Sequence, residues 1–245
     1  MPRIFFLGTA GAGGMPGRAM NCILIETSKE RIVLDFGEGC GQRLEQHGYT
    51  LCDFNLVYIS HLHMDHYNGL FDAVVRSSIR GCNKLVLAAA GGVYRGLNNI
   101  VELLPRSIRS NVVFIKIPLD GLRIGSFFLK PIPVNHSIET YGLYIEVSGK
   151  RIVYSADTMP TRGIINLLNN VDLLIHEVTL PSNKSDLSPI LGHTSVSQAL
   201  KLKEMMNQDS ILAIVHTTTE SMKELREVSL PRGVLVPYDH TILGI

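Results

Sequence analysis

The chain has 245 residues, 45% of them hydrophobic, so it can bury a continuous core as one large domain or two small ones. Its formal net charge is +1, which neither requires nor excludes a polyanionic partner. No apolar run reaches the roughly 18 residues of a membrane span, and the amino terminus lacks a signal-peptide pattern. We therefore expect a cytoplasmic protein with no membrane partner.

Strand and helix patterns alternate along the chain. The expected strands are residues 3–7, 23–26, 31–35, 56–60, 84–88, 112–117, 127–134, 143–147, 151–155, 173–176, 211–216 and 234–237. The expected helices are residues 41–47, 68–79, 92–104, 161–168 and 195–206. This alternation predicts an α/β fold.

One segment of the chain is repeated. Residues 23–33 (ILIETSKERIV) match residues 143–153 (LYIEVSGKRIV) at a constant offset of 120 residues. Both copies have the pattern of a β-hairpin, and they end near Asp35 and Asp157 respectively. The repeat predicts two similar halves packed around a shared site. Because no low-complexity linker separates the halves, we expect one domain over residues 1–245.

The four cysteines, Cys22, Cys40, Cys52 and Cys82, form no C-x-x-C pair and no dense framework. Such sparse spacing is typical of reduced thiols rather than of a disulfide scaffold. We therefore expect free and mostly buried thiols in a reducing compartment.

Three histidines and an aspartate follow the strand over residues 56–60, in the run HLHMDH. Residues i and i+2 of an extended segment face the same way, so His61 and His63 can hold one ion. Asp65 and His66 fall where the chain turns into the next helix, and they point to a second position. Nitrogen and carboxylate ligands without a thiolate suit zinc, with manganese, iron or cobalt as alternatives.

Four more candidate ligands lie at the ends of later strands: His136, Asp157, His176 and His216. Groups just past the carboxyl ends of strands converge on one rim of an open α/β sheet, which is where ligands bind. This placement predicts two metal ions. One ion would be held by His61, His63 and His136, the other by Asp65, His66 and His216, with Asp157 bridging both.

These motifs resemble, in order, those of the metallo-β-lactamase superfamily, and within it the tRNase Z group. Besides the histidine cluster they are residues 6–9 (FLGT) with Arg18 and Asn21, 34–39 (LDFGEG), 135–137 (NHS), 155–158 (SADT), 176–179 (HEVT) and 192–194 (GHT). The resemblance covers nearly the whole chain. It implies a four-layer αβ/βα sandwich with a dinuclear site at one sheet edge. It also implies phosphodiester hydrolysis, with a metal-bound hydroxide as the nucleophile.

The chain departs from the tRNase Z pattern at two places. The arm that grips tRNA would lie between His136 and Asp157, but here these residues are 21 apart and a hairpin fills the interval. Residues 216–220 (HTTTE) replace the serine and the Arg-Tyr pair that follow the last histidine ligand. The family also contains a group without the arm, the cyclic phosphodiesterases of phosphonate breakdown. Residues 135–137 (NHS) and the ending from Leu230 to Gly244 resemble that group as well.

Four residues have expected roles in catalysis or in supporting it: His193, Glu177, Asp65 and Asp35. His193 precedes the helix that begins at the capping box Ser195-x-x-Gln198, so it lies on a loop. Paired with Glu177, it is our candidate for protonating the leaving oxygen, although such a pair could also only hold the groove together. Asp65 can orient or deprotonate the attacking water. Asp35 is expected to support a ligand imidazole rather than to bind metal.

We therefore expect a metal-dependent hydrolase with two divalent ions, acting as a phosphodiesterase on small or cyclic phosphodiesters, and forming a homodimer. The first alternative is a tRNA 3′-processing endoribonuclease that binds RNA 3′ ends without the arm. A basic patch could assist it if the cations at positions 76, 80, 84, 95, 106 and 109 share a face. The second alternative is a hydrolase of the thioesterase or lactonase type, which does not usually carry the His-Glu and Gly-His-Thr segments.

Overall fold

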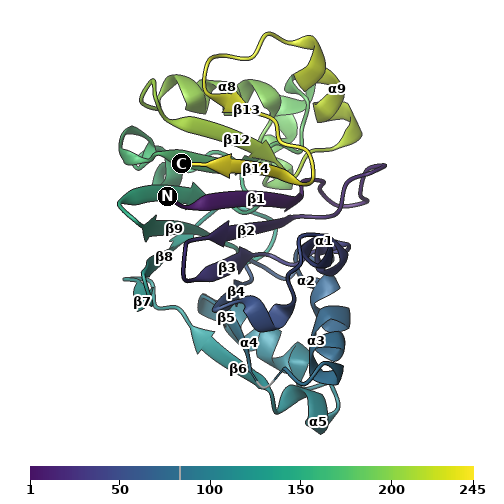
Figure 1. Ribbon diagram of the computed structural model, residues 1–245. Helices are drawn as coiled ribbons and strands as arrows, with labels where there is room; N and C mark the ends of the chain where they lie inside the picture. The colour runs from purple at the N-terminus through teal and green to yellow at the C-terminus, as the bar shows by residue number, and fades with distance from the viewer. Residues whose placement is uncertain (83) are drawn as a thin grey trace.

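Two mixed sheets of seven strands each form the centre of the molecule (Figure 1). The computed structural model describes residues 1–82 and 84–245. The first sheet has the order β14 (Thr241–Gly244), β1 (Arg3–Gly8), β2 (Cys22–Glu26), β3 (Arg31–Leu34), β4 (Leu56–Tyr58), β5 (Leu85–Ala89) and β6 (Val112–Lys116). The second has the order β13 (Val234–Leu235), β12 (Ile211–Val215), β11 (Leu173–Glu177), β10 (Lys150–Tyr154), β9 (Tyr141–Val147), β8 (Phe127–Pro133) and β7 (Leu122–Ile124).

Helices cover the outer faces of the two sheets. In Figure 1, α8 and α9 lie at the top and α3, α4 and α5 at the bottom, with the strands between them. The α-helices are α1 (Cys40–Gln46), α2 (Met64–Tyr67), α3 (Gly69–Ile79), α4 (Gly91–Val101), α5 (Arg106–Arg109), α6 (Arg162–Ile165), α7 (Ser188–Leu191), α8 (Val196–Glu204) and α9 (Thr219–Glu227). The 3-10 helices are η1 (Leu51–Asp53), η2 (Leu168–Asn170) and η3 (Ser182–Leu187). This is the expected αβ/βα arrangement. In the part of the chain that the structure describes, no helix is long and apolar enough to cross a membrane.

The repeat predicted from the sequence appears as two equivalent hairpins. β2 and β3 pair so that Ile25 faces Ile32, and β9 and β10 pair so that Ile145 faces Ile152, in the same register 120 residues later. Each hairpin is followed by parallel strands within its own sheet. Apart from β14, which pairs with β1 in the first sheet, each half of the chain therefore builds one sheet, and the strand directions follow the same order in both sheets.

A single apolar layer lies between the two sheets. It takes buried side chains from both halves, among them Phe6 and Ile25 of the first sheet and Ile145 and Ile152 of the second. Each such side chain stabilises the fold by about 1.5–3 kcal/mol relative to exposure. Two further apolar clusters lie under the helices of the first and second halves. The shared layer fixes the edges of the two sheets against each other.

The cysteines are paired, so the prediction of free thiols is wrong. Cys22 forms a disulfide with Cys40, and Cys52 with Cys82, with Cα atoms 5.8 and 5.6 Å apart. The first pair meets because the segment entering β2 runs beside the segment entering α1, where Gly37 N donates to Asn21 O. Pairing across 18 and 30 residues depends on such tertiary contacts, which the spacing of cysteines does not reveal.

The hairpin β9–β10 fills the interval between His136 and Asp157. β9 begins five residues after His136 and β10 ends three residues before Asp157, so no protruding arm leaves the described chain in this interval. The structure thus agrees with the departure from tRNase Z that the sequence indicates.

A buried carboxylate at the end of β2 provides a test of the fold. Glu26 is 3% exposed and accepts hydrogen bonds from Arg31 Nε (2.6 Å) and Tyr49 Oη (2.7 Å), and it also pairs with Arg3. Burial alone would raise the pKa of Glu26, but these donors outweigh it and lower the pKa below its ordinary value.

We expect Glu26→Gln to lower the free energy of unfolding by about 1–3 kcal/mol at pH 7, because charged donors lose their acceptor. A lowered folded-state pKa stabilises the protein above the unfolded pKa near 4.5, and this contribution is lost as the pH falls through the folded value. The difference between the wild type and the variant should therefore shrink in acid. Urea unfolding at pH 7 and pH 3.5 measures it, and an equal difference at both pH values would contradict the assignment.

Candidate metal centre

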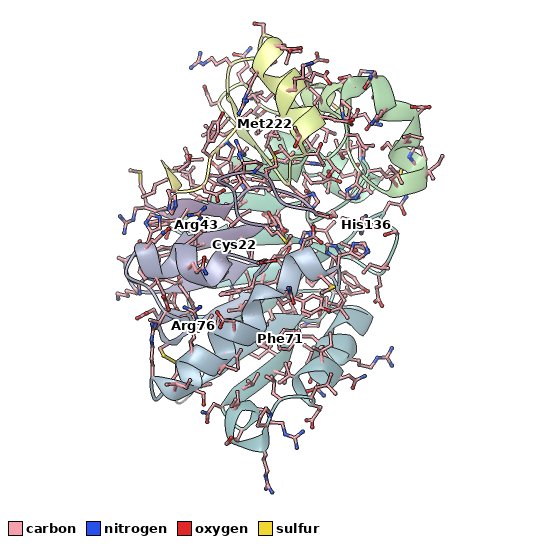
Figure 2. The ribbon with its side chains drawn as sticks, turned by 90° about the vertical axis from the view of Figure 1, so that its right-hand side faces the viewer. Cys22, Arg43, Phe71, Arg76, His136 and Met222 are labelled. Carbon is pink, nitrogen blue, oxygen red and sulfur yellow. A yellow bond between two sulfur atoms is a disulfide. The ribbon has the colours of Figure 1, made fainter. Side chains whose placement is uncertain are left out.

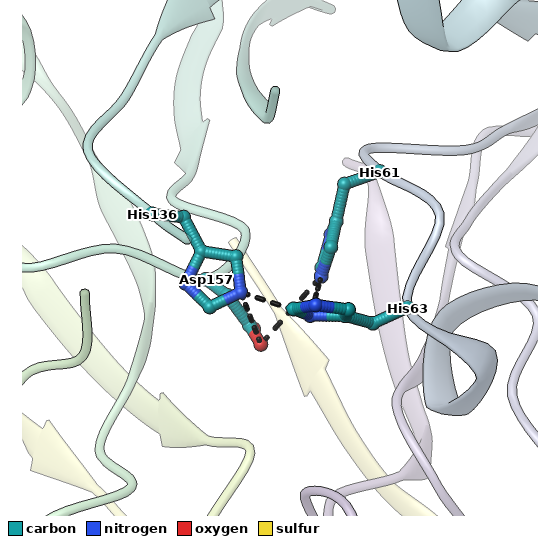
Figure 3. Close-up of side chains that lie close together, drawn as sticks. All are labelled: His61, His63, His136 and Asp157. Atoms are coloured by element: carbon teal, nitrogen blue, oxygen red, sulfur yellow. Dashed lines mark hydrogen bonds and ion pairs between the residues drawn. The ribbon is translucent and has the colours of Figure 1, made fainter. Parts of the chain in front are cut away.

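Three imidazole nitrogens converge at the junction of the two halves. His63 Nδ1 lies 3.2 Å from His61 Nε2 and 3.0 Å from His136 Nε2 (Figure 3). Figure 2 shows His136 at the level where the N-terminal half meets the C-terminal half. A tetrahedral ion with bonds of 2.0–2.1 Å separates its ligands by about 3.3 Å, which is close to this spacing.

A second group lies beside the first. His216 Nε2 is 3.0 Å from Asp65 Oδ2, and His66 Nε2 is 3.6 Å from the same oxygen. Asp157 Oδ2 stands between the groups, 3.3 Å from His66 Nε2 and from His216 Nε2 and 3.8 Å from His61 Nε2. The seven residues thus fall into the two predicted sets of possible ligands, with Asp157 common to both.

Three strands end in a left-handed turn that directs the following part of the chain toward the centre. The chain leaves β3, β10 and β12 through Asp35, Ala156 and His216, whose φ angles are 56°, 52° and 51°. This left-handed conformation costs a residue with a side chain about 1–3 kcal/mol, and such strain gathers where a structure holds groups for function. The cluster from residue 61 to 66 needs no such turn, because α2 begins directly after His63.

The outward-facing nitrogen of four of these histidines is held by a hydrogen bond. His66 Nδ1 donates to Asp35 Oδ2 (2.6 Å) and His136 Nδ1 donates to Gly192 O (2.9 Å). His61 Nδ1 is 2.9 Å from Ser60 Oγ, and His216 Nδ1 is 2.9 Å from Thr179 Oγ1. Both hydroxyls direct their own hydrogens elsewhere, to Asp35 Oδ2 and to His216 O, so they accept from the rings. In the neutral form of each of these four rings, Nε2 is therefore the nitrogen that carries the lone pair and faces the centre.

The donor set fits divalent metal ions. Across residues 1–82 and 84–245, His66 Nε2 and Asp157 Oδ1 are buried side-chain atoms without a hydrogen-bond partner. Burial lowers the pKa values of His61, His63 and His136, which favours the neutral rings that bind metal. His63 Nδ1 can donate a hydrogen to only one of the two nitrogens that lie 3.2 and 3.0 Å from it, whereas a cation between them would satisfy all three. Thiolates are absent from the set, which suits zinc, manganese, iron or cobalt.

Asp35 lies beneath the ligands and binds none of the converging nitrogens. Its carboxylate accepts from Ser60 N (2.7 Å), Ser60 Oγ (2.8 Å), His66 Nδ1 and Tyr154 Oη. Sequence reasoning identified Asp35 but missed Ser60 and Tyr154. Ser60 could have been found as the hydroxyl that precedes the histidine cluster.

His193 lies at the edge of the centre and pairs with Glu177. Its Nδ1 is 2.8 Å from Glu177 Oε1, and its ring centroid lies 4.8 Å from that of His136 and 5.8 Å from that of His216. Burial lowers the pKa of His193, but the Glu177 carboxylate outweighs this and raises the pKa to about 9. Glu177 is fixed in turn by the backbone N–H groups of residues 158, 179 and 194.

Some candidate residues lie outside the centre. His176 belongs to neither ligand group, because its buried ring turns to the backbone, where Nδ1 donates to Glu177 O. Three of the six cations considered as an RNA-binding patch form ion pairs: Arg76 and Arg80 with Glu45, and Arg109 with Glu102.

The sequence is similar to one family model and to several known proteins. The model of a family described as "Anti-Pycsar protein Apyc1" matches residues 2–230. The chain is also 29% identical over 233 residues to "Ribonuclease Z, mitochondrial" of Drosophila melanogaster. That alignment covers 84% of this chain but 30% of the relative, and the chain spans about a third of the length of the curated relatives it matches.

Solved structures share the fold. The metallo-beta-lactamase fold protein YhfI from Bacillus subtilis superposes with a TM-score of 0.84 at 17% identity, covering 100% of both chains. A diphosphatase from the PhnP family superposes with a TM-score of 0.80 at 17% identity, covering 99% of this chain and 96% of that one. The predicted metallo-β-lactamase fold and the resemblance to ribonuclease Z are thereby confirmed.

Proposed function

The chain belongs to the family described as Anti-Pycsar protein Apyc1, and from its metal-ligand geometry we propose that it is a dinuclear metal phosphodiesterase acting on small or cyclic phosphodiesters. The observation that carries this proposal is the convergence of seven histidine and aspartate side chains in two sets that share Asp157. Its relatives are named ribonuclease Z and zinc phosphodiesterase, which supports phosphodiester hydrolysis as the reaction type.

The ligands that would hold the two ions come from both halves of the chain. The first set is His61, His63, His136 and Asp157, and the second is Asp65, His66, His216 and Asp157. When bound, two divalent ions would neutralise phosphoryl oxygens and lower the pKa of water toward about 7. Zinc is the metal that we propose, and manganese, iron and cobalt suit the same donors.

Asp65 and His193 would move protons on either side of the phosphorus. Asp65 Oδ2 faces the centre, and a carboxylate there can orient the attacking water and accept its proton. His193 has its Nδ1 fixed by Glu177, which leaves Nε2 to donate a proton to the leaving oxygen. The phosphorus then gains a hydroxyl from water and loses an alkoxide, which departs as an alcohol.

The structure around the centre favours a small substrate over precursor tRNA. The hairpin β9–β10 fills the interval where an RNA-binding arm would lie. Arg76, Arg80 and Arg109 form ion pairs with Glu45 or Glu102, which reduces the positive charge that they could offer to phosphates. Affinity for nucleic acid comes mostly from neutralised phosphates, so this loss matters. Cleavage of tRNA 3′ ends remains the second candidate, because the similarity to ribonuclease Z of Drosophila melanogaster favours it.

The test compares kcat/KM for a small cyclic phosphodiester and for precursor tRNA at one stated salt concentration. Metal content is measured on the same preparation by elemental analysis. We expect close to two transition-metal ions per chain and a higher kcat/KM for the small diester. Efficient cleavage of precursor tRNA just after the discriminator nucleotide would reverse this order and favour the endonuclease.

We expect Asp35→Asn to weaken metal binding by about 10–100-fold, as loss of a carboxylate behind a ligand imidazole does in other metal sites. Asp35 acts through His66, whose ring it orients. Competition with a chromophoric chelator measures the affinity without reference to activity. An unchanged affinity together with lower thermal stability would show that Asp35 only supports the fold.

A further inference from the structure

The carboxylate of Asp35 contacts a side chain from the other half of the chain. Its Oδ2 accepts from His66 Nδ1 (2.6 Å) and from Ser60 Oγ (2.8 Å), both in the first half. It also accepts from Tyr154 Oη, and Asn21 Nδ2 lies 3.4 Å away. Tyr154 ends β10 of the second sheet, 119 residues after Asp35. The support behind the proposed ligand His66 therefore includes a contact between the two halves.

The direction of the hydrogen bond from Tyr154 to Asp35 is set by Asn21. Asn21 Nδ2 donates to Tyr154 Oη, so the phenol oxygen acts as an acceptor there. The single hydrogen of the phenol is then left for Asp35 Oδ2. The amide is oriented in turn by the carboxylate, because an amide oxygen in the place of Nδ2 would face Asp35 Oδ2 at 3.4 Å. Donation thus runs in one direction, from Asn21 through Tyr154 to Asp35.

Burial makes this chain of hydrogen bonds important to the groups in it. Asn21, Asp35 and Tyr154 are each at most 1% exposed. Tyr154 belongs to the layer between the two sheets, which is otherwise apolar, and a hydroxyl there costs free energy unless it is hydrogen-bonded. Burial and the Asp35 carboxylate raise the pKa of Tyr154 well above its ordinary value, so the phenol keeps the hydrogen that it donates.

Tyr58 offers a comparison within the same layer. It is also fully buried, and its hydroxyl also crosses to the other half of the chain. There it donates to the backbone carbonyl of Tyr141 at 2.8 Å. Both phenols can therefore stabilise the packing of one half on the other. Of the two, Tyr154 alone donates to the carboxylate behind His66.

We propose that Tyr154, directed by Asn21, is a positioning residue of the second ligand set. It holds the carboxylate of Asp35 in the orientation in which Oδ2 accepts from His66 Nδ1, and so aims His66 Nε2 at the ion. This inference rests on the proposed function, because it concerns the second of the two ion positions. Tyr154 contacts neither substrate nor ion and acts through Asp35.

The test compares Tyr154→Phe with Tyr58→Phe, because each variant loses one buried hydroxyl from the same layer. Stepwise titration with cobalt, followed by its visible absorption, measures the affinity and the coordination of each ion. We expect Tyr154→Phe to weaken binding of the second ion by about 3–10-fold, the effect of one lost hydrogen bond, and to alter its absorption. Tyr58→Phe should leave both unchanged, although urea unfolding should show that both variants are less stable.

Asn21→Ala is the second variant, because it keeps the phenol but removes the group that directs it. It should alter the cobalt absorption in the same way, with a smaller loss of affinity than in Tyr154→Phe.

A further measurement does not depend on the metal. The proton on His66 Nδ1 gives a nuclear magnetic resonance signal that is identified by its loss in His66→Gln. Tyr154→Phe should shift this signal, because the acceptor of the proton loses one of its donors, whereas Tyr58→Phe should not.

Equal effects of the two phenylalanine variants on cobalt binding, or unchanged cobalt affinity and absorption in Tyr154→Phe, would overturn the positioning role. If the wild type binds two cobalt ions but turns over no phosphodiester, the proposed function fails, and the cobalt titration still decides the role of Tyr154. If it binds no cobalt, the signal of His66 still decides whether Tyr154 acts on that ring through Asp35.

Discussion

Replacement of Asp157 by alanine should remove both metal ions and lower turnover by more than about a thousandfold, because no nucleophile is then formed near neutral pH. Its Oδ2 lies within 4.0 Å of inward-facing nitrogens of both ligand groups. Loss of this one oxygen leaves each group with three ligands. His63→Ala, in contrast, should deplete mainly the ion of the first group while activity falls with it.

Elemental analysis and turnover are measured together on the two variants. Asp209→Ala serves as the control, because Asp209 is an exposed aspartate remote from the ligands. Circular dichroism confirms that each variant is folded. Two ions and full activity in either ligand variant would refute the assignment of these residues as ligands.

His193→Ala is expected to retain both metal ions and to lose about 10²–10⁴-fold in turnover, the range that general acids contribute. The residue pairs with Glu177 and stands beside the proposed ligand rings, outside the two sets that share Asp157. The loss should be greatest for alkyl diesters. p-Nitrophenolate leaves with little protonation, so bis-p-nitrophenyl phosphate should be much less affected.

The measurement is the ratio of kcat on an alkyl diester to kcat on bis-p-nitrophenyl phosphate, for the wild type and the variant. Added imidazole should restore part of the alkyl activity. His47→Ala is a matched control, since His47 lies at the end of α1 and pairs with His240 instead of with the centre. Equal losses on both substrates would remove His193 from the role of proton donor.

Local patterns predicted much of the fold. The match of residues 23–33 with 143–153 predicted two hairpins, and β2–β3 and β9–β10 pair in the same register. The capping box at Ser195 predicted the start of α8. α9 was missed, because only Met222 and Leu225 give it an apolar face among polar residues. β14 was missed because a four-residue strand forms only by pairing with β1 at the other end of the chain.

The site was predictable where chemistry is concentrated in sequence, and less so where it depends on tertiary contacts. The run from His61 to His66 predicts metal ligands by itself, and the structure brings its three histidines and Asp65 into groups that could hold an ion. The hydrogen bonds from His136 to Gly192 and from His216 to Thr179 join residues 56 and 37 positions apart, and no spacing rule predicts them. The prediction of free thiols was wrong for the same reason. Distance in space decides pairing, whereas the sequence shows only distance along the chain.

The sharing of ligands between the two sheets has a thermodynamic consequence. Each proposed ion binds residues before β7 together with residues after β8, so it cross-links the duplicated halves as well as serving catalysis. Because the ions would bind only when the two halves are packed together, the free energy of unfolding would then depend on the metal concentration. An ion present at 100 times its Kd contributes about 2.7 kcal/mol, which chelation would withdraw. Limiting the supply of the proposed metal would thus lower the folded fraction of the chain along with its activity.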